Sequence, residues 1–259
     1  MSNLLQIHNL TKYYVKQVGW LKQQRICALD AVSFTVRQGE TVAIIGETGS
    51  GKSTLIKLIA GIDTPHAGSI ALNGTLLKPY DYKSRCQQIR MIFQDGLASL
   101  DPQRNIGQQL LEPLRFNTDW PLAKQHQHVL ATLERVGLLA EHFDFYPHML
   151  ASGQLARVCI ARAILLNPLV IVADEALSAL DPSIRAQIIN LLIDLKKEMG
   201  VSFIFSSHSP ELVRHLADKI LVLHHGKMLE FDTTVTLITK PKQPLTQALL
   251  HMENLRKSV

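Results

Sequence analysis

Residues Gly46–Thr54 read GETGSGKST; they follow the apolar run Val42–Ile45 and precede the periodic segment Leu55–Ala60. This order predicts a strand, a phosphate-binding loop and a helix. A backbone can wrap a triphosphate only where no side chain blocks its N–H groups, and Gly46 and Gly51 permit that approach. The N–H groups and the positive end of the helix then attract the anion. The alternative is an ordinary glycine-rich turn, which other motifs must exclude.

The loop's side chains have distinct expected roles. Lys52 is predicted to reach the β- and γ-phosphates, Ser53 to place its hydroxyl on Mg²⁺, and Thr54 to continue the first helical turn. The nucleotide-binding residues expected here are Gly46, Glu47, Thr48, Gly49, Ser50, Gly51, Lys52, Ser53 and Thr54.

The composition limits the class of protein. The chain has 259 residues, of which 46% are hydrophobic and 19% charged, as in folded globular proteins. Its formal charge of +5 suits anionic partners, but no Lys/Arg block exceeds two residues, so no nucleic acid partner is expected. Three scattered cysteines fit a reducing compartment. No apolar run approaches the ~18–20 residues that span a bilayer, and the N-terminus lacks a signal-peptide pattern.

The hydrophobic pattern predicts one α/β domain with three parts. Residues 1–96 and 152–231 are expected to form a nucleotide-binding core with an antiparallel β subdomain, 97–151 an inserted α-helical subdomain, and 232–259 a C-terminal extension. Strands are predicted over Leu4–Leu10, Ile26–Val36, Thr41–Ile45 and Ser69–Asn73, with Val15–Gln24 as a loop.

The second half alternates strands and helices. Leu169–Ala173 is apolar at every position, as in a parallel sheet covered on both faces. Ile184–Met199 is predicted as a helix and Val201–Phe205 as another buried strand. Together with the phosphate-binding loop, this alternation predicts a three-layer α/β fold, a P-loop NTPase core.

Two carboxylates end the apolar run LVIVADE. The C-terminal ends of parallel strands are where open α/β sheets bind ligands, so Asp174 is expected to hold Mg²⁺ and Glu175 to orient the attacking water. If the chain had no phosphate-binding loop, Asp174 and Glu175 would be better interpreted as two solvated acids at a strand end. The phosphate-binding loop upstream favours their role in nucleotide hydrolysis.

Further motifs follow in a fixed order: Tyr14 in KYY, Gln94 in MIFQD, Ser178–Asp181 as SALD, and His208 in FSSHS. Together these resemble the ATP-binding subunits of ABC transporters over nearly the whole chain. The resemblance implies that Gln94 senses Mg²⁺ and the transmembrane partner, that Ser178 and Asp181 form the D-loop, and that His208 contacts the γ-phosphate. It also implies that Tyr14 stacks on adenine, with Tyr13 as the alternative.

Within that family, Ala98–Arg115 and Lys240–Leu250 are similar to the oligopeptide and dipeptide transport branch, and Tyr146–Gln154 to its members associated with antimicrobial-peptide uptake and resistance. The resemblance implies an ATPase on the cytoplasmic face of the bacterial inner membrane. Its partners would be transmembrane permease subunits and, indirectly, a periplasmic peptide-binding protein. Many relatives carry a C-terminal cysteine cluster for an iron–sulfur centre; no cysteine follows Cys159, so none is expected here.

The signature loop departs from the family pattern Leu-Ser-Gly-Gly-Gln and reads Leu150, Ala151, Ser152, Gly153, Gln154. In the family the serine donates to the γ-phosphate held by the opposite subunit. Ala151 removes that hydrogen bond to a charged group, worth ~1.5–3 kcal/mol. Ser152 either restores a hydroxyl or obstructs close approach, and neutral drift explains the change equally well.

The resemblance also implies a dimer in which each ATP lies between one subunit's phosphate-binding loop and the other's signature loop. The altered loop favours a heterodimer with a second ABC ATPase subunit over a homodimer. A groove around Gln94–Leu114 would receive the permease, with Arg104 and Arg115 either as contacts or as solvated charges. One alternative is a soluble ABC ATPase without a transport role. Another is a regulatory subunit that binds nucleotide but hardly hydrolyses it; the retained Glu175 and His208 argue against this second alternative.

Overall fold

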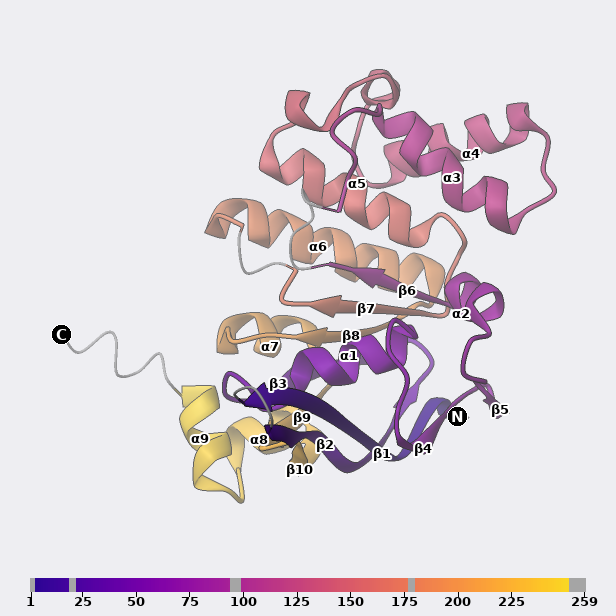
Figure 1. The fold of residues 1–259 in the computed structure, drawn as a ribbon. Coiled ribbons are helices and arrows are strands. Elements are labelled where there is room, and N and C mark those ends of the chain that lie inside the picture. The colour runs from indigo at the N-terminus through magenta and orange to yellow at the C-terminus, as the bar shows by residue number, and fades with distance from the viewer. Residues whose placement is uncertain (1–2, 19–21, 94–98, 177–179, 252–259) are drawn as a thin grey trace.

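A computed structural model describes residues 3–18, 22–93, 99–176 and 180–251 (Figure 1). Its central sheet has six strands in the order β10-β9-β3-β8-β7-β6, of which β9 to β6 run parallel and β10 is an antiparallel edge. The strands are β3 (Thr41–Ile45), β6 (Ile89–Ile92), β7 (Val170–Asp174), β8 (Ser202–Ser206), β9 (Lys219–His224) and β10 (Lys227–Thr233).

A second sheet is antiparallel, in the order β2-β1-β4-β5. Its strands are β1 (Asn3–Val18), β2 (Lys22–Arg37), β4 (Ala67–Leu72) and β5 (Thr75–Leu76). The helices are α1 (Lys52–Ala60), α2 (Tyr82–Gln88), α3 (Ile106–Asn117), α4 (Leu122–Arg135), α5 (Ser152–Ile164), α6 (Pro182–Met199), α7 (Pro210–Leu216), α8 (Thr234–Thr239) and α9 (Pro244–His251), with 3₁₀ turns η1 (Ala140–Phe143) and η2 (Pro147–Met149).

Strand β3 shows why the sheet is covered on both faces. All five of its residues are buried. Val42 and Ile44 share a core with α1 and the antiparallel sheet, whereas Ala43 and Ile45 share one with α7, α8 and α9. Successive strand side chains point to opposite faces, so a wholly apolar strand needs cover on each side. The predicted three-layer α/β architecture is confirmed.

The helices α3, α4 and α5 form the layer at the top of Figure 1. Their buried side chains, including Leu110, Val129 and Val158, share one core with Ile171 of β7 and Phe203 of β8. The helical layer is therefore packed onto the sheet face opposite α1.

The predicted loop at Val15–Gln24 is wrong. β1 and β2 continue pairing past the body of the sheet, with Gln17 opposite Gln23 and Val18 opposite Lys22. Tyr14, Val15 and Ile26 are exposed along this extension. Because neither face of the hairpin is buried there, the sequence carries no alternation of apolar and polar residues to mark a strand.

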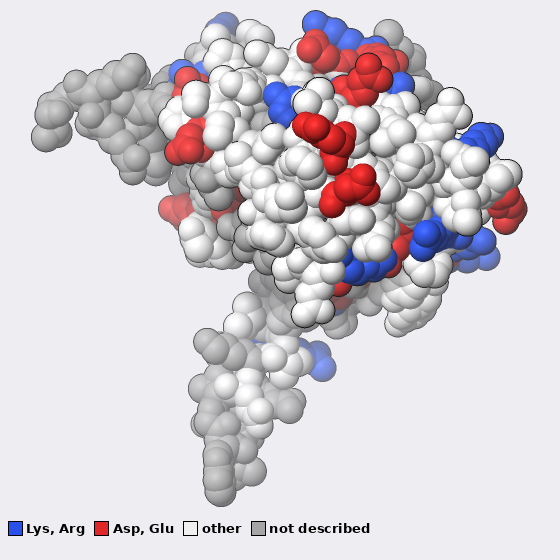
Figure 2. All heavy atoms as spheres, turned by 90° about the horizontal axis from the view of Figure 1, so that it is seen from above, with Lys and Arg blue, Asp and Glu red and all other residues white. Residues whose placement is uncertain are grey.

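Charges of both signs are interspersed on the face that Figure 2 views, which looks down onto the helical layer. No helix in the described ranges is both long and apolar enough to cross a membrane.

Candidate nucleotide site

Three neighbouring strands bring the predicted residues to one edge of the central sheet. β3, β8 and β7 lie side by side and run parallel, with Ser206 opposite both Ile44 and Asp174. The phosphate-binding loop follows β3, Glu175 follows β7 and His208 follows β8. The site therefore forms at the carboxyl ends of the strands, where open α/β sheets bind ligands.

Two glycines of the phosphate-binding loop are required by close backbone contacts. Gly46 has φ +155°, and a Cβ there would stand 2.2 Å from the carbonyl oxygen of Leu223. Gly51 has φ +107°, and its Cβ would stand 2.4 Å from the carbonyl oxygen of Ala28. Any other residue would displace the loop from the strands behind it.

The start of α1 leaves its backbone donors available. Its N-cap is Gly51, no side chain caps the first turn, and the first turn has no acidic residue. The Ser50 hydroxyl is buried and has no hydrogen-bond partner among the described residues. Unsatisfied N–H groups, the helix dipole and a buried hydroxyl together suit an anion such as a phosphate group.

Lys52 lies inside the loop and is 5% exposed. Its ammonium donates to the carbonyl oxygens of Gly46 (2.9 Å) and Glu47 (3.0 Å). Burial lowers the pKa of Lys52, while the negative charges of Glu175 and Asp174 act to raise it. The loop thus holds a buried cation facing two carboxylates. The oxygens of a bound phosphate can replace the two carbonyl oxygens as hydrogen-bond acceptors of the Lys52 ammonium.

Asp174 links the phosphate-binding loop to β8. Its Oδ1 accepts from Ser53 Oγ (3.0 Å) and from Ser206 Oγ (2.7 Å). Ser206 also accepts from the backbone N–H of Glu175 (2.9 Å). Ser206 is a functional residue that was not predicted from the motif FSSHS; the available signal was its position at the end of a buried strand, two residues before His208.

Glu175 and His208 are paired directly. His208 Nε2 lies 2.9 Å from Glu175 Oε1, and the two side chains are 45% and 21% exposed. Glu175 has φ +47°, a left-handed conformation that few non-glycine residues adopt and that is concentrated at functional sites. The proposed base and the proposed γ-phosphate contact thus form one unit at the open edge of the site.

Tyr14 and Tyr13 both lie partly exposed on β1. The Tyr14 hydroxyl donates to Asp63 Oδ2 (2.8 Å), just beyond α1, and Lys12 Nζ lies 5.3 Å from its ring centroid. Burial raises the pKa of Tyr14, and its hydrogen bond to Asp63 adds to the effect. Tyr13 instead packs edge-on against His66. The contact with Asp63 places Tyr14 beside the helix that carries Lys52, and Asp63 had not been recognised from sequence.

The signature loop begins α5. Ala151 is the N-cap and is exposed, Ser152 is exposed in the first turn, and Leu150 is buried. A Cβ on Gly153 would meet Ile184 of α6 at 3.0 Å. Gln154 Oε1 accepts from the Ala151 N–H at 2.9 Å.

The remaining predicted residues fall in different places. Gln94 and Ser178 lie outside the described residues. Asp181 is the exposed N-cap of α6. Arg104 pairs with Glu112 and Arg115 is exposed in the last turn of α3, so neither position decides between a partner contact and a solvated charge.

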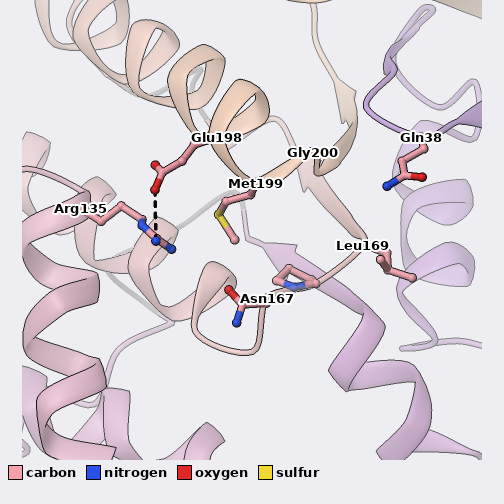
Figure 3. A pocket seen from close by; sticks show the side chains of 8 residues that line it. Gln38, Arg135, Asn167, Leu169, Glu198, Met199 and Gly200 are labelled. Carbon is pink, nitrogen blue, oxygen red and sulfur yellow. Dashed lines mark ion pairs between the residues drawn. The ribbon is translucent and has the colours of Figure 1, made fainter.

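A cavity of about 310 Å³ lies at the other end of the sheet (Figure 3). Leu169 and Gly200 precede β7 and β8 at its wall, and Arg135 pairs with Glu198 at 3.1 Å. Its charged side chains neutralise each other, and it is remote from the carboxylates and the phosphate-binding loop. The nucleotide site is at the opposite strand ends.

Comparison with known proteins agrees with this geometry. Residues 29–178 match the ABC transporter domain. The chain belongs to the ABC transporter family. It is 43% identical over 250 residues to the putrescine export system ATP-binding protein SapF of Escherichia coli K12, covering 96% of this chain and 93% of that protein.

Two further relatives are named as ATP-binding proteins of peptide or dipeptide transport. The peptide transport system ATP-binding protein SapF of Salmonella typhimurium is 42% identical over 250 residues, covering 96% of this chain and 93% of that protein. The dipeptide transport ATP-binding protein DppF of Escherichia coli K12 is 43% identical over 251 residues, covering 95% of this chain and 75% of that protein.

A solved structure supports the same assignment. It is a dimeric ATP-binding cassette in a post-hydrolysis state with ADP and phosphate, 28% identical, with a TM-score of 0.77 over 89% of this chain and 98% of that chain. The chain is therefore an ABC-type ATPase subunit that binds ATP.

Proposed function

We propose that the chain binds Mg²⁺·ATP, closes on it with a second ABC ATPase subunit, and powers a peptide transporter in the bacterial inner membrane. The observation that carries the ATPase mechanism is the convergence of Lys52, Asp174, Glu175 and His208 at one edge of the sheet. The identity to peptide transport ATP-binding proteins supports the transport role.

The donors around Asp174 suit Mg²⁺. The Ser53 hydroxyl and the Asp174 carboxylate are hard oxygen ligands 3.0 Å apart, and one or two such ligands with phosphates and water are what Mg²⁺ takes in nucleotide sites. Ser53 and Asp174 would hold the ion, with Gln94 as a further ligand. Once bound, Mg²⁺ neutralises charge that develops on the phosphate oxygens.

The chain's own side chains divide the remaining work. Lys52 contacts the β- and γ-phosphates once it exchanges its two carbonyl acceptors for phosphate oxygens. His208 turns to the γ-phosphate, and Glu175 Oε1 accepts a proton from the attacking water. Tyr14 stacks on the adenine. The pairing of Glu175 with His208 favours hydrolysis over a merely regulatory nucleotide-binding role.

A second subunit completes the site. The signature loop at Leu150–Gln154 would face the partner's nucleotide, and the partner's loop would face Lys52. The similar cassette solved with ADP and phosphate is a dimer. Ala151 lacks the hydroxyl that would reach the partner's γ-phosphate, so we favour a heterodimer in which this chain's own site hydrolyses faster. Ser178 and Asp181 would lie at the same interface.

The transported solute is a peptide in this proposal, delivered by a periplasmic binding protein and moved by permease subunits that dock around Gln94–Leu114. One relative's name supplies a second candidate, putrescine export. Peptide import and putrescine export differ in the direction of transport and in the charge of the solute. The permease subunits select the solute.

Affinity purification of the full chain from mildly solubilised membranes tests the assembly. Copurification of permease subunits and a second ATPase is expected. Reconstituted vesicles then distinguish the solutes: ATP hydrolysis stimulated by peptide supports the proposal, and stimulation by putrescine alone replaces it. A set of only soluble partners would support the non-transport alternative.

A further inference from the structure

The signature loop lacks the side chain that normally caps its helix. Ala151 is the N-cap of α5 and has no oxygen to accept from the first-turn N–H groups. What the structure provides is the reverse contact, in which the Ala151 N–H donates to Gln154 Oε1 (2.9 Å). The backbone position of Ala151 therefore depends on the orientation of the Gln154 amide.

The other end of that amide contacts a buried histidine. Gln154 Nε2 lies 3.0 Å from Nε2 of His142, which belongs to η1 in the helical layer and is 6% exposed. The His142 ring packs edge-on against Phe145, with a centroid distance of 5.1 Å. The histidine is fixed by packing, so it can fix the glutamine.

The hydrogen bonds of Gln154 favour one tautomer of His142. Because the Ala151 N–H is a donor, Oε1 of Gln154 faces it and the –NH₂ group faces His142. His142 Nε2 must then accept, which leaves the ring proton on Nδ1. Nδ1–H has an acceptor in the carbonyl oxygen of Leu139 at 3.1 Å.

The other tautomer has one competing contact. The Leu139 N–H lies 2.9 Å from His142 Nδ1 and would donate to it if the proton were on Nε2. That arrangement sets the Nε2–H of His142 against the –NH₂ of Gln154 at 3.0 Å, two donors facing each other. The Nδ1–H form sets its own N–H against the Leu139 N–H at 2.9 Å, but it is the form that keeps the hydrogen bond from Gln154, and with it the contact to the signature loop.

We propose that neutral His142 is a positioning residue for the signature loop: through Gln154 it holds the Ala151 backbone in place where the family's serine would cap the helix. The inference rests on the proposed function, because the loop's position matters only if it closes a partner's site. His142 is buried and would act only through Gln154.

Turnover of the copurified transporter complex tests it. His142→Phe keeps the aromatic packing but leaves the partly buried Gln154 donor unpaired, which is expected to lower single-turnover hydrolysis at the partner's site about tenfold. ATP affinity at this chain's own Lys52 site should not change. His142→Gln offers an amide oxygen to Gln154 and should restore most of the rate.

Two further variants separate positioning from general destabilisation. Gln154→Ala should lower the rate about as much as His142→Phe, and the double variant no further, because both break one chain of contacts. His126→Phe is the control, since His126 is an exposed histidine that packs on Phe143 of the same 3₁₀ turn. It should retain the wild-type rate.

The outcomes also distinguish the inference from the proposed function. If Glu175→Gln stops turnover while His142→Phe leaves it intact, the inference fails and the ATPase role stands. If Glu175→Gln has no effect, the mechanism itself fails. ¹⁵N NMR of the histidine rings in the full wild-type chain gives a test without mutation: a protonated Nδ1 and bare Nε2 at His142 are expected, and a protonated Nε2 overturns the proposal.

Discussion

The phosphate-binding loop and the signature loop are held in very different ways. The phosphate-binding loop is contacted by distant parts of the chain. The carbonyl oxygens of Leu223 and Ala28 leave no room for a side chain at Gly46 and Gly51, respectively. The Gly226 N–H donates to the Ser50 carbonyl oxygen at 3.0 Å. The signature loop instead exposes Ala151 and Ser152. The half-site that holds this chain's own nucleotide is fixed by the fold, whereas the half-site offered to a partner depends on fewer contacts.

Lys52→Ala should give the largest effect, because it removes the buried cation from the fixed half-site. We expect ATP affinity to fall by on the order of 100-fold or more, since charge-assisted contacts to two phosphates are lost together. Isothermal titration of the purified chain with ATP measures it. Lys57→Ala, an exposed lysine in the last turn of the same helix, is the control. Unchanged affinity in Lys52→Ala would refute the loop assignment.

Glu175→Gln should separate binding from chemistry. The amide cannot take the proton of the attacking water, so turnover should fall by roughly 10²–10⁴-fold while ATP binding persists. The dimer closed on ATP should then accumulate, which size-exclusion chromatography with ATP detects. Glu211→Gln changes an acid in the first turn of α7 and serves as the control. Brisk phosphate release from Glu175→Gln would exclude Glu175 as the base.

The same contrast explains what the sequence could predict. A phosphate-binding loop needs glycines at fixed spacing for backbone reasons, so Gly46 and Gly51 were recognisable without a structure. Asp174 and Glu175 were recognisable because they end a wholly apolar strand. Those features are local in the chain, and the fold class followed from them.

Contacts between distant segments were not predictable. Ser206 bridges Asp174 and Glu175 only because β8 pairs with β7 in a particular register. His142 reaches Gln154 across a turn whose packing no periodicity encodes. The exposed β1–β2 hairpin was missed for a related reason, since backbone pairing without burial leaves no hydrophobic pattern.

Ala151→Ser should strengthen the weaker half-site. A serine can accept from the first turn of α5, worth about 1 kcal/mol to the helix, or donate to the partner's γ-phosphate. We expect hydrolysis at the partner's nucleotide to rise about tenfold, the effect of one hydrogen bond to a charged group. Single-turnover assays with the reconstituted complex resolve the two sites.

Equal rates at both sites before the substitution would contradict the proposed asymmetry. If the sites are unequal and Ala151→Ser leaves the slower one unchanged, Ser152 already supplies the missing hydroxyl. Ser152→Gly then becomes the deciding variant, because it removes that hydroxyl without touching Ala151.

Asp63→Asn should have the smallest effect on ATP affinity. It changes the hydrogen-bond network that places Tyr14 beside the fixed half-site. Burial acts to raise the pKa of Asp63, but hydrogen bonds from Lys12 (2.5 Å), Tyr14 (2.8 Å) and the Thr64 N–H (2.7 Å) outweigh it and lower the pKa. A carboxylate whose folded pKa is lowered stabilises the fold above its unfolded pKa, near 3.9, and this contribution is lost as pH falls through the folded value.

Urea unfolding of wild type and Asp63→Asn should therefore differ by about 1 kcal/mol at neutral pH and converge as the pH falls below the lowered pKa of folded Asp63, where its carboxyl group is protonated in both states. Asp144→Asn, which removes an exposed carboxylate, is the control. ATP affinity should weaken only a few-fold, because Tyr14 keeps its place on β1 and loses one anchor for its hydroxyl. A loss of affinity as large as that of Lys52→Ala would mean that Asp63 belongs to the binding site itself and that the fixed half-site extends beyond the phosphate-binding loop.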